Sequence, residues 1–173
     1  KIYNFSAGPA VLDQSVLDAT SKAVKEFNGL GMSLMEMSHR SKPVMDMVAE
    51  TESLTRELLH IPDGYHVLFL QGGASLQFAM IPMNLLGEDQ TVDYTDTGAW
   101  SAKAIKEAHL FGNVNVACSS KESLYNHIPK ELNQSSHAVY LHITSNNTIY
   151  GTQWKDFPTP LNPNSRASNI FKW

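Results

Sequence analysis

Two adjacent glycines, Gly72 and Gly73, separate the apolar run at residues 68–70 from a segment of helical character that begins at Ala74. Glycine lets the backbone approach a ligand closely, and the N–H groups in the first turn of a helix have no partner within the helix. Such a turn suits a phosphate. Many α/β turns carry two glycines for structural reasons alone, so both interpretations stay open here. The turn lacks the Lys-Ser/Thr pair of a P-loop.

Three further groups of residues could contact a ligand. His39 and Arg40 form a compact cationic pair suited to carboxylate or phosphate, or to a salt bridge at a helix entry. Trp100 follows a strand end, where an indole either stacks on a flat heteroaromatic ligand or packs in the core. The polar run at residues 144–148, which ends at Thr148, offers hydroxyl and amide groups for a polar ring or for turn capping.

Metal and thiol chemistry receive little support from the sequence. The seven histidines show no convincing ligand spacing, so no metal site is expected. Cys118 is the only cysteine, which excludes an internal disulfide and favours a reducing, cytoplasmic compartment. We interpret Cys118 as a packing residue.

The composition is typical of one globular domain with a real core: 173 residues, 42% hydrophobic and 17% charged. A formal net charge of -4 argues against nucleic acid as a partner, although small anions need only local positive groups. Apolar runs are too short to span a membrane, so no membrane association is expected.

The elements that would hold these residues alternate between helix and strand. We expect helices capped by Asp13 and Ser41, and the remaining elements are strands at 65–70, 91–95, 114–117 and 138–143 and helices at 74–86 and 100–111. This spacing predicts an α/β fold, a mostly parallel sheet with helices on both faces. Ligands of such sheets bind at the carboxyl ends of the strands, where the glycine turn, residues 96–98 and residues 144–147 all fall.

The combination of these motifs resembles the phosphoserine aminotransferases, class V pyridoxal-phosphate enzymes of the type I aminotransferase fold. The resemblance runs in order and spacing through five stretches: residues 4–9, 33–40, 67–78, 93–100 and 142–151. It implies the N-terminal half of the family's chain, part of the large domain. The expected division is a substrate-facing segment at 1–14, an incomplete cofactor-binding α/β domain at 15–157, and a proline-rich connection with a divergent tail at 158–173.

The resemblance implies pyridoxal 5'-phosphate as the cofactor. Gly73, Ala74 and Ser75 would cradle its phosphate, Trp100 would stack on its pyridine ring, and Thr148 would bond the ring hydroxyl. Some members of the family have Gly-Arg at the positions of Ala74 and Ser75. This chain would therefore rely on backbone N–H groups and the Ser75 hydroxyl.

The resemblance also implies the reaction: amino transfer between L-glutamate and 3-phosphohydroxypyruvate, a phosphorylated 2-oxo acid, in serine biosynthesis. The products are O-phospho-L-serine and 2-oxoglutarate. His39 and Arg40 would meet the substrate's phosphate or carboxylate, and Ala7 would contribute only its backbone where some members have serine. Family members are homodimers, so a homodimer is expected.

The residues that make the cofactor reactive in this family are missing from the sequence. The family's aspartate for the pyridine nitrogen is absent from residues 165–173, and none of the lysines from Lys103 onward lies in the motif of the Schiff-base lysine. No catalytic residue is therefore assigned. Two alternatives stay open: a truncated, non-catalytic fragment that folds or associates without turnover, and a phosphate-ligand binding module outside the family.

Overall fold

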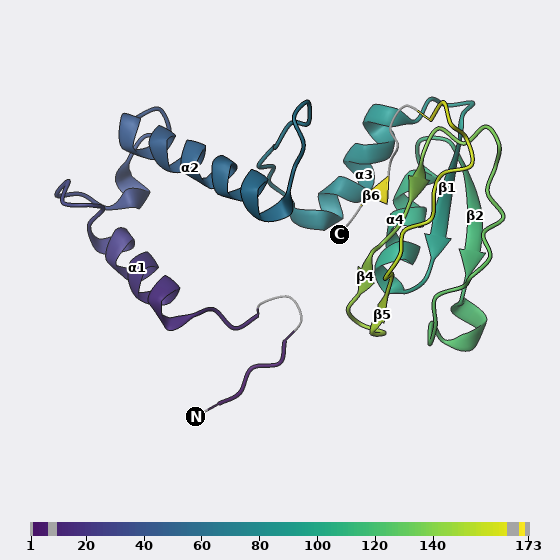
Figure 1. Ribbon diagram of the computed structural model, residues 1–173, viewed down its shortest axis with the longest axis horizontal. Coiled ribbons are helices and arrows are strands. Elements are labelled where there is room, and N and C mark those ends of the chain that lie inside the picture. The colour runs from purple at the N-terminus through teal and green to yellow at the C-terminus, as the bar shows by residue number, and fades with distance from the viewer. Residues whose placement is uncertain (1, 7–9, 166–169, 172–173) are drawn as a thin grey trace. The chain divides into compact units, whose positions relative to one another are not determined.

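The computed structural model describes residues 2–6, 10–165 and 170–171 (Figure 1). The chain forms two compact units, Lys1–Phe69 and Leu70–Trp173. The expected division at residues 14 and 157 stays a prediction. Position 7, where Ala7 was expected to face a substrate, lies outside the described residues.

The first unit contains three helical segments: α1 at Gln14–Lys25, the 3-10 helix η1 at Leu34–Glu36, and α2 at Lys42–Leu59. The predicted cap of α1 is confirmed, since the Ser15 N–H donates to Asp13 Oδ1 at 2.9 Å. Helix α2 begins after Ser41 as predicted, but the predicted side-chain cap is wrong. The Ser41 hydroxyl instead donates to the Ser38 carbonyl at 2.7 Å, so it is directed away from the helix amides.

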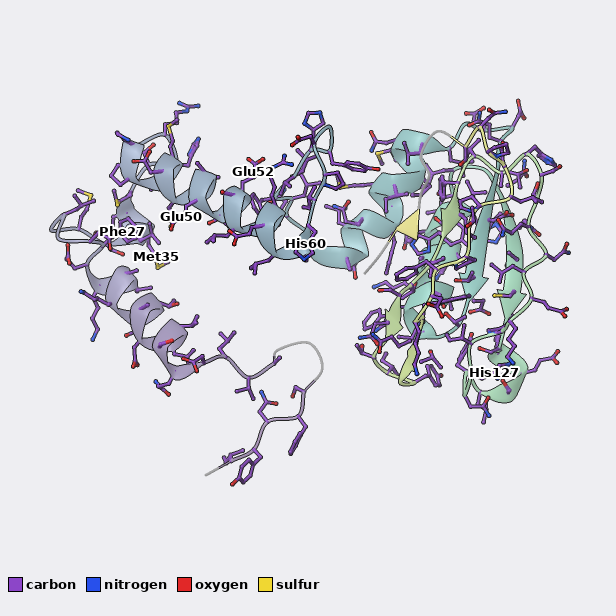
Figure 2. All side chains as sticks on the ribbon, viewed as in Figure 1. Phe27, Met35, Glu50, Glu52, His60 and His127 are labelled. Carbon is purple, nitrogen blue, oxygen red and sulfur yellow. The ribbon has the colours of Figure 1, made fainter. Side chains whose placement is uncertain are left out.

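The last turns of α2 are fixed by local bonds, and Glu52 and His60 mark their position in Figure 2. Arg56 lies 2.9 Å from Glu52 and donates to the Tyr65 carbonyl at 3.0 Å. His60 ends the helix in the left-handed region, with φ of 50°. The chain therefore changes direction sharply after α2, and a turn follows at residues 63–64.

The strand predicted for residues 65–70 is wrong: these described residues form no strand. Leu68, Phe69 and Leu70 are exposed by 71%, 57% and 53%. A strand requires a neighbour for its backbone N–H and C=O groups, and an apolar sequence does not supply one. No described strand pairs with this segment.

The second unit is built on a parallel sheet with strand order β2-β1-β3-β6. Its strands are β1 Thr91–Asp96, β2 Asn113–Ser119, β3 Leu141–His142 and β6 Ile170–Phe171, and a separate antiparallel pair consists of β4 Asn146–Asn147 and β5 Thr152–Gln153. Strand β3 is shorter than the predicted 138–143. The bond from the Val139 N–H to the Thr91 carbonyl, at 2.9 Å, nevertheless extends contact with β1. Strand β6 falls in a tail for which no element was predicted.

Two hydrophobic clusters cover the two faces of this sheet. On one face, α3 (Gly73–Leu85) and α4 (Ala99–Ala108) pack against β1 and the residues before β3; the buried residues there include Phe78, Val92, Tyr94 and Tyr140. The other cluster contains Leu141, Ile143, Cys118 and Trp154. The parallel α/β class is confirmed. Among the described residues, loop segments that contribute Ile128, Leu132 and Phe157, rather than helices, cover this second face.

Candidate cofactor site

The glycine turn adopts the geometry that its sequence predicts. Gly72 precedes α3 in the left-handed region, with φ of 90°, and Gly73 follows with φ of 58°. A Cβ atom at Gly72 would lie 2.4 Å from the Leu76 side chain, so no other residue fits there without a shift. The first bond of the helix runs from the Leu76 N–H to the Gly72 carbonyl. The N–H groups of Gly73, Ala74 and Ser75 therefore have no partner within the helix and can bind an anion.

The turn forms one wall of a cavity of about 280 Å³. The cavity is lined by Gly72, Gly73, Ala74, Ser75, Phe78, Trp100, Thr144 and Asn146. The structure thus brings together four of the five predicted cofactor residues. A Cβ atom at Gly73 would meet no heavy atom within 4 Å, so the space beside the turn is open.

The fifth predicted residue, Thr148, is not among the lining residues, but it bonds Trp100, which is. The Trp100 indole Nε1 donates to the Thr148 hydroxyl at 3.1 Å. This bond joins the start of α4 to the segment after β4 and fixes the orientation of the indole. The sequence suggested Trp100 and Thr148 as separate ligand contacts and did not suggest that they bond each other.

A buried polar network supports the Trp100 side of the site. Ser101 Oγ accepts from the N–H groups of Thr97 and Gly98 at 2.8 and 2.9 Å, which closes the turn into α4. Asn147 is fully buried and donates to the Thr97 hydroxyl at 3.0 Å. The Thr152 hydroxyl donates to the Thr97 carbonyl at 2.7 Å. Strand ends far apart in sequence are thereby locked around the cavity.

Thr144 contributes a buried hydroxyl to the cavity wall. Its side chain is 1% exposed, and among the described residues its Oγ1 has no hydrogen-bond partner. A buried hydroxyl without a partner costs free energy, so a ligand that bonds it would gain affinity. The polar run at 144–148 indicated this region, but only the structure identifies Thr144 as the unsatisfied member.

Lys103 is a residue that sequence reasoning did not connect with the site. Its ammonium Nζ lies 3.1 Å from the Ser75 hydroxyl, so α4 brings a positive charge to the glycine turn. Lys103 follows Trp100 by three residues, which places both on one face of the helix. This three-residue spacing is the signal in the sequence that could have connected Lys103 with the site.

The packing beneath the cavity keeps a histidine neutral. His142 lies 1% exposed on β3, and its ring stacks on Tyr94 with centroids 4.5 Å apart. Burial lowers the pKa of His142 to about 3, because the charged imidazolium would lose its hydration. Burial likewise raises the pKa of Tyr140 to about 12. These groups support the site as packing residues, without charge at neutral pH.

His39 and Arg40 belong to the first unit, where they form an exposed turn between η1 and α2. The Arg40 N–H donates to the Ser38 hydroxyl at 3.2 Å. Their predicted role toward a substrate stays a prediction.

Within the residues that the structure describes, no helix is long and apolar enough to cross a membrane.

The parallel sheet and the cavity beside the glycine turn are found in a chain that a known family model matches. The family model "Aminotransferase class-V" matches residues 2–162, and the chain belongs to this family. Its similar curated relatives are phosphoserine aminotransferases. The proteins of Desulfotalea psychrophila, Geobacillus kaustophilus and Bacillus subtilis are 52%, 51% and 51% identical to it, over 91%, 93% and 90% of the chain.

Solved structures give the same result. Phosphoserine aminotransferase from Bacillus circulans subsp. alkalophilus matches 91% of the chain with a TM-score of 0.87 and 49% identity. The PLP-bound enzyme from Trichomonas vaginalis matches 94% of the chain with a TM-score of 0.86 and 35% identity. The chain covers 44% and 47% of these two structures and 44–46% of the three curated relatives. It thus spans less than half the length of each of these five proteins.

Proposed function

We propose that this chain forms the phosphate-binding half of the cofactor site in a phosphoserine aminotransferase. The proposed reaction transfers an amino group between L-glutamate and 3-phosphohydroxypyruvate, and gives O-phospho-L-serine and 2-oxoglutarate. The observation that carries the proposal is the cavity of about 280 Å³, in which the N-terminal turn of α3, an indole and an unsatisfied buried hydroxyl converge. The identity of about half the residues to phosphoserine aminotransferases supports the choice of substrates.

The residues present fit pyridoxal 5'-phosphate. The N–H groups of Gly73, Ala74 and Ser75 would hold the phosphate at the positive end of α3. Thr144 would satisfy its buried hydroxyl on a polar group of the ligand. The start of α3 would thus bind the anionic phosphate, and the neighbouring indole of Trp100 would bind the aromatic ring.

Trp100 would stack on the pyridine ring, and Thr148 would hold that indole in place. Because the Thr148 oxygen accepts from Trp100 Nε1, the hydroxyl still has its own hydrogen to donate to the ring hydroxyl of the cofactor. Bound in this way, the cofactor supplies a ring that accepts electrons from the α-carbon of an amino acid. The chain's own residues bind and orient it.

In the same proposal, His39 and Arg40 meet the carboxylate or phosphate of the substrate, since a guanidinium pairs with either group through two parallel bonds. Residue 7 contributes through its backbone, since alanine has no side-chain donor. The proposed partners are small molecules and a second copy of the subunit.

The cofactor assignment can be tested by titrating the chain with pyridoxamine 5'-phosphate, which binds without reacting with lysines. We expect saturable binding, no binding of ATP, and a loss of affinity of roughly fivefold in Trp100→Leu, since stacking contributes about 1 kcal/mol. The matched control is Trp154→Leu, a tryptophan of the other hydrophobic cluster. Binding of ATP in preference to the pyridoxamine ligand would indicate a different phosphate-binding module.

The reaction is tested on the full gene product. We expect L-glutamate and 3-phosphohydroxypyruvate to give 2-oxoglutarate, and unphosphorylated hydroxypyruvate to react far more slowly. A full product that binds the cofactor but turns over neither substrate would refute the proposed reaction and leave the cofactor assignment intact.

A further inference from the structure

We infer that Lys103 is the charged side-chain ligand of the cofactor phosphate in this chain, acting together with the Ser75 hydroxyl. The inference rests on the proposed cofactor site and goes beyond it, because it names the source of the positive charge. The Lys103 ammonium lies 3.1 Å from Ser75 Oγ, and Ser75 lines the cavity. The two residues come from different helices, α4 and α3, so the contact depends on their packing.

The cavity needs a charge that its own wall does not provide. None of its eight lining residues carries a formal charge, and the start of α3 supplies only the equivalent of about half a positive charge. A phosphate monoester carries a charge of roughly −1.5 to −2 near neutral pH. Lysine is a common phosphate ligand that acts as a point charge. Lys103 can supply this charge, because a hydrogen bond joins its ammonium to Ser75 in the cavity wall.

The donors and acceptors of the Lys103–Ser75 pair are arranged for an anion. The ammonium has three hydrogens and uses one on Ser75, which leaves two for phosphate oxygens. Ser75 accepts from Lys103 and therefore directs its own hydrogen elsewhere. Both groups can donate to the same phosphate while their mutual bond remains.

Lys103 is available for this role. Neither ion pair found among the described residues includes it, since these join Lys42 to Asp46 and Arg56 to Glu52. The residue is exposed. Trp100 and Lys103 share one face of α4, so a single helix delivers the stacking surface and the charge.

The test compares the binding of pyridoxamine 5'-phosphate and of pyridoxamine, which lacks the phosphate, in three variants. Lys103→Met should bind the phosphorylated ligand about tenfold more weakly, since a charge-assisted bond at an exposed site contributes at the low end of its range. Lys103→Arg should keep most of the affinity. Lys106→Met, an equal change of charge at an exposed position on the same helix, should bind like the unmodified chain.

The phosphate is identified by the second ligand and by salt. Lys103→Met should leave the weaker binding of pyridoxamine unchanged, and the difference for the phosphorylated ligand should shrink at about 0.5 M salt. Equal affinity of Lys103→Met and the unmodified chain would overturn the inference alone, as would equal losses in Lys103→Met and Lys106→Met. If the unmodified chain bound no pyridoxamine 5'-phosphate, the proposed cofactor would fall and the role of Lys103 with it.

Discussion

Gly98 lies against Asn147, a fully buried side chain of the site, and an alanine at position 98 would test how rigid the site is. A Cβ atom added to Gly98 would lie 2.4 Å from Asn147 Cγ and 2.5 Å from its Oδ1. Asn147 is 0% exposed and donates to the Thr97 hydroxyl at 3.0 Å, while its Oδ1 accepts from the Ser101 N–H at 3.4 Å. The amide cannot move away without breaking these bonds.

The expected cost of Gly98→Ala follows from these contacts. Overpacking a filled interior costs about 1–3 kcal/mol, and each buried hydrogen bond that is lost adds about 1 kcal/mol. The substitution should therefore destabilise the unit Leu70–Trp173 by about 2–4 kcal/mol. Gly98 has φ of 165°, an extended conformation open to any residue, so the cost is steric and does not come from backbone strain.

Two further variants separate the steric effect from helix capping, because Gly98 is also the N-cap of α4. Serine caps helices better than alanine, so Gly98→Ser should recover stability if capping dominates and should stay destabilised if the clash dominates. We expect the clash to dominate. In Gly87→Ala the new Cβ would meet only the exposed Gln90 side chain, at 3.2 Å, and the cost should stay below about 1 kcal/mol.

The measurement is native-state hydrogen exchange at the amides of β1, which lies in the centre of the sheet and reports the opening of this unit. A loss of opening free energy in Gly98→Ala no larger than in Gly87→Ala would refute the reasoning. So would recovery in Gly98→Ser.

Two further predictions concern pH and the first unit. The folded pKa of His142, about 3, lies below its ordinary 6.5, so the folded unit is fully stable with respect to this group above about pH 6.5 and loses stability as the pH falls toward 3, by up to ~1.4 kcal/mol per pH unit. In His142→Phe the free energy of unfolding measured in urea should depend less on pH between pH 4 and 6.5. An unchanged slope would contradict this. In Lys1–Phe69, α1 buries none of its residues and α2 buries only Val44. The α1 amides of the isolated chain should therefore exchange hydrogen readily, with opening free energies below about 2 kcal/mol. Protection of α1 equal to that of β1 would contradict this and would show that apolar residues such as Val16 and Leu17 are covered.

The sequence was sufficient to predict elements whose pattern is local. Strand β1 and helices α3 and α4 were predicted because apolar periodicity and turn residues mark them without reference to the rest of the chain. Residues 65–70 have the same apolar character and form no strand, while β6, in a tail without a clear pattern, pairs with β3. Strand status depends on a distant partner, which a single-sequence pattern does not contain.

The site divides along the same line. The nearness of Trp100 to the polar run at 144–148 could be predicted, since parallel strands such as β1 and β3 end at the same edge of a sheet. The glycine turn also lines the cavity, although residues 65–70 before it form no strand. The contact of Lys103 with Ser75 could not be predicted, because it depends on how α3 packs against α4. Nor could the unsatisfied hydroxyl of Thr144, since burial of one polar atom is a property of the packed structure.

Thr148 illustrates how the structure changes the meaning of a predicted ligand. The resemblance implies a bond from Thr148 to the ring hydroxyl, yet its oxygen already accepts from Trp100. A hydroxyl oxygen carries two lone pairs and one hydrogen, so Thr148 can accept from the indole and still bond the ring hydroxyl of the proposed cofactor. A residue that merely bonded the ligand could be replaced by any donor. Thr148 also orients Trp100, so serine would preserve that bond together with the proposed cofactor contact, whereas valine, of nearly equal shape, would lose both.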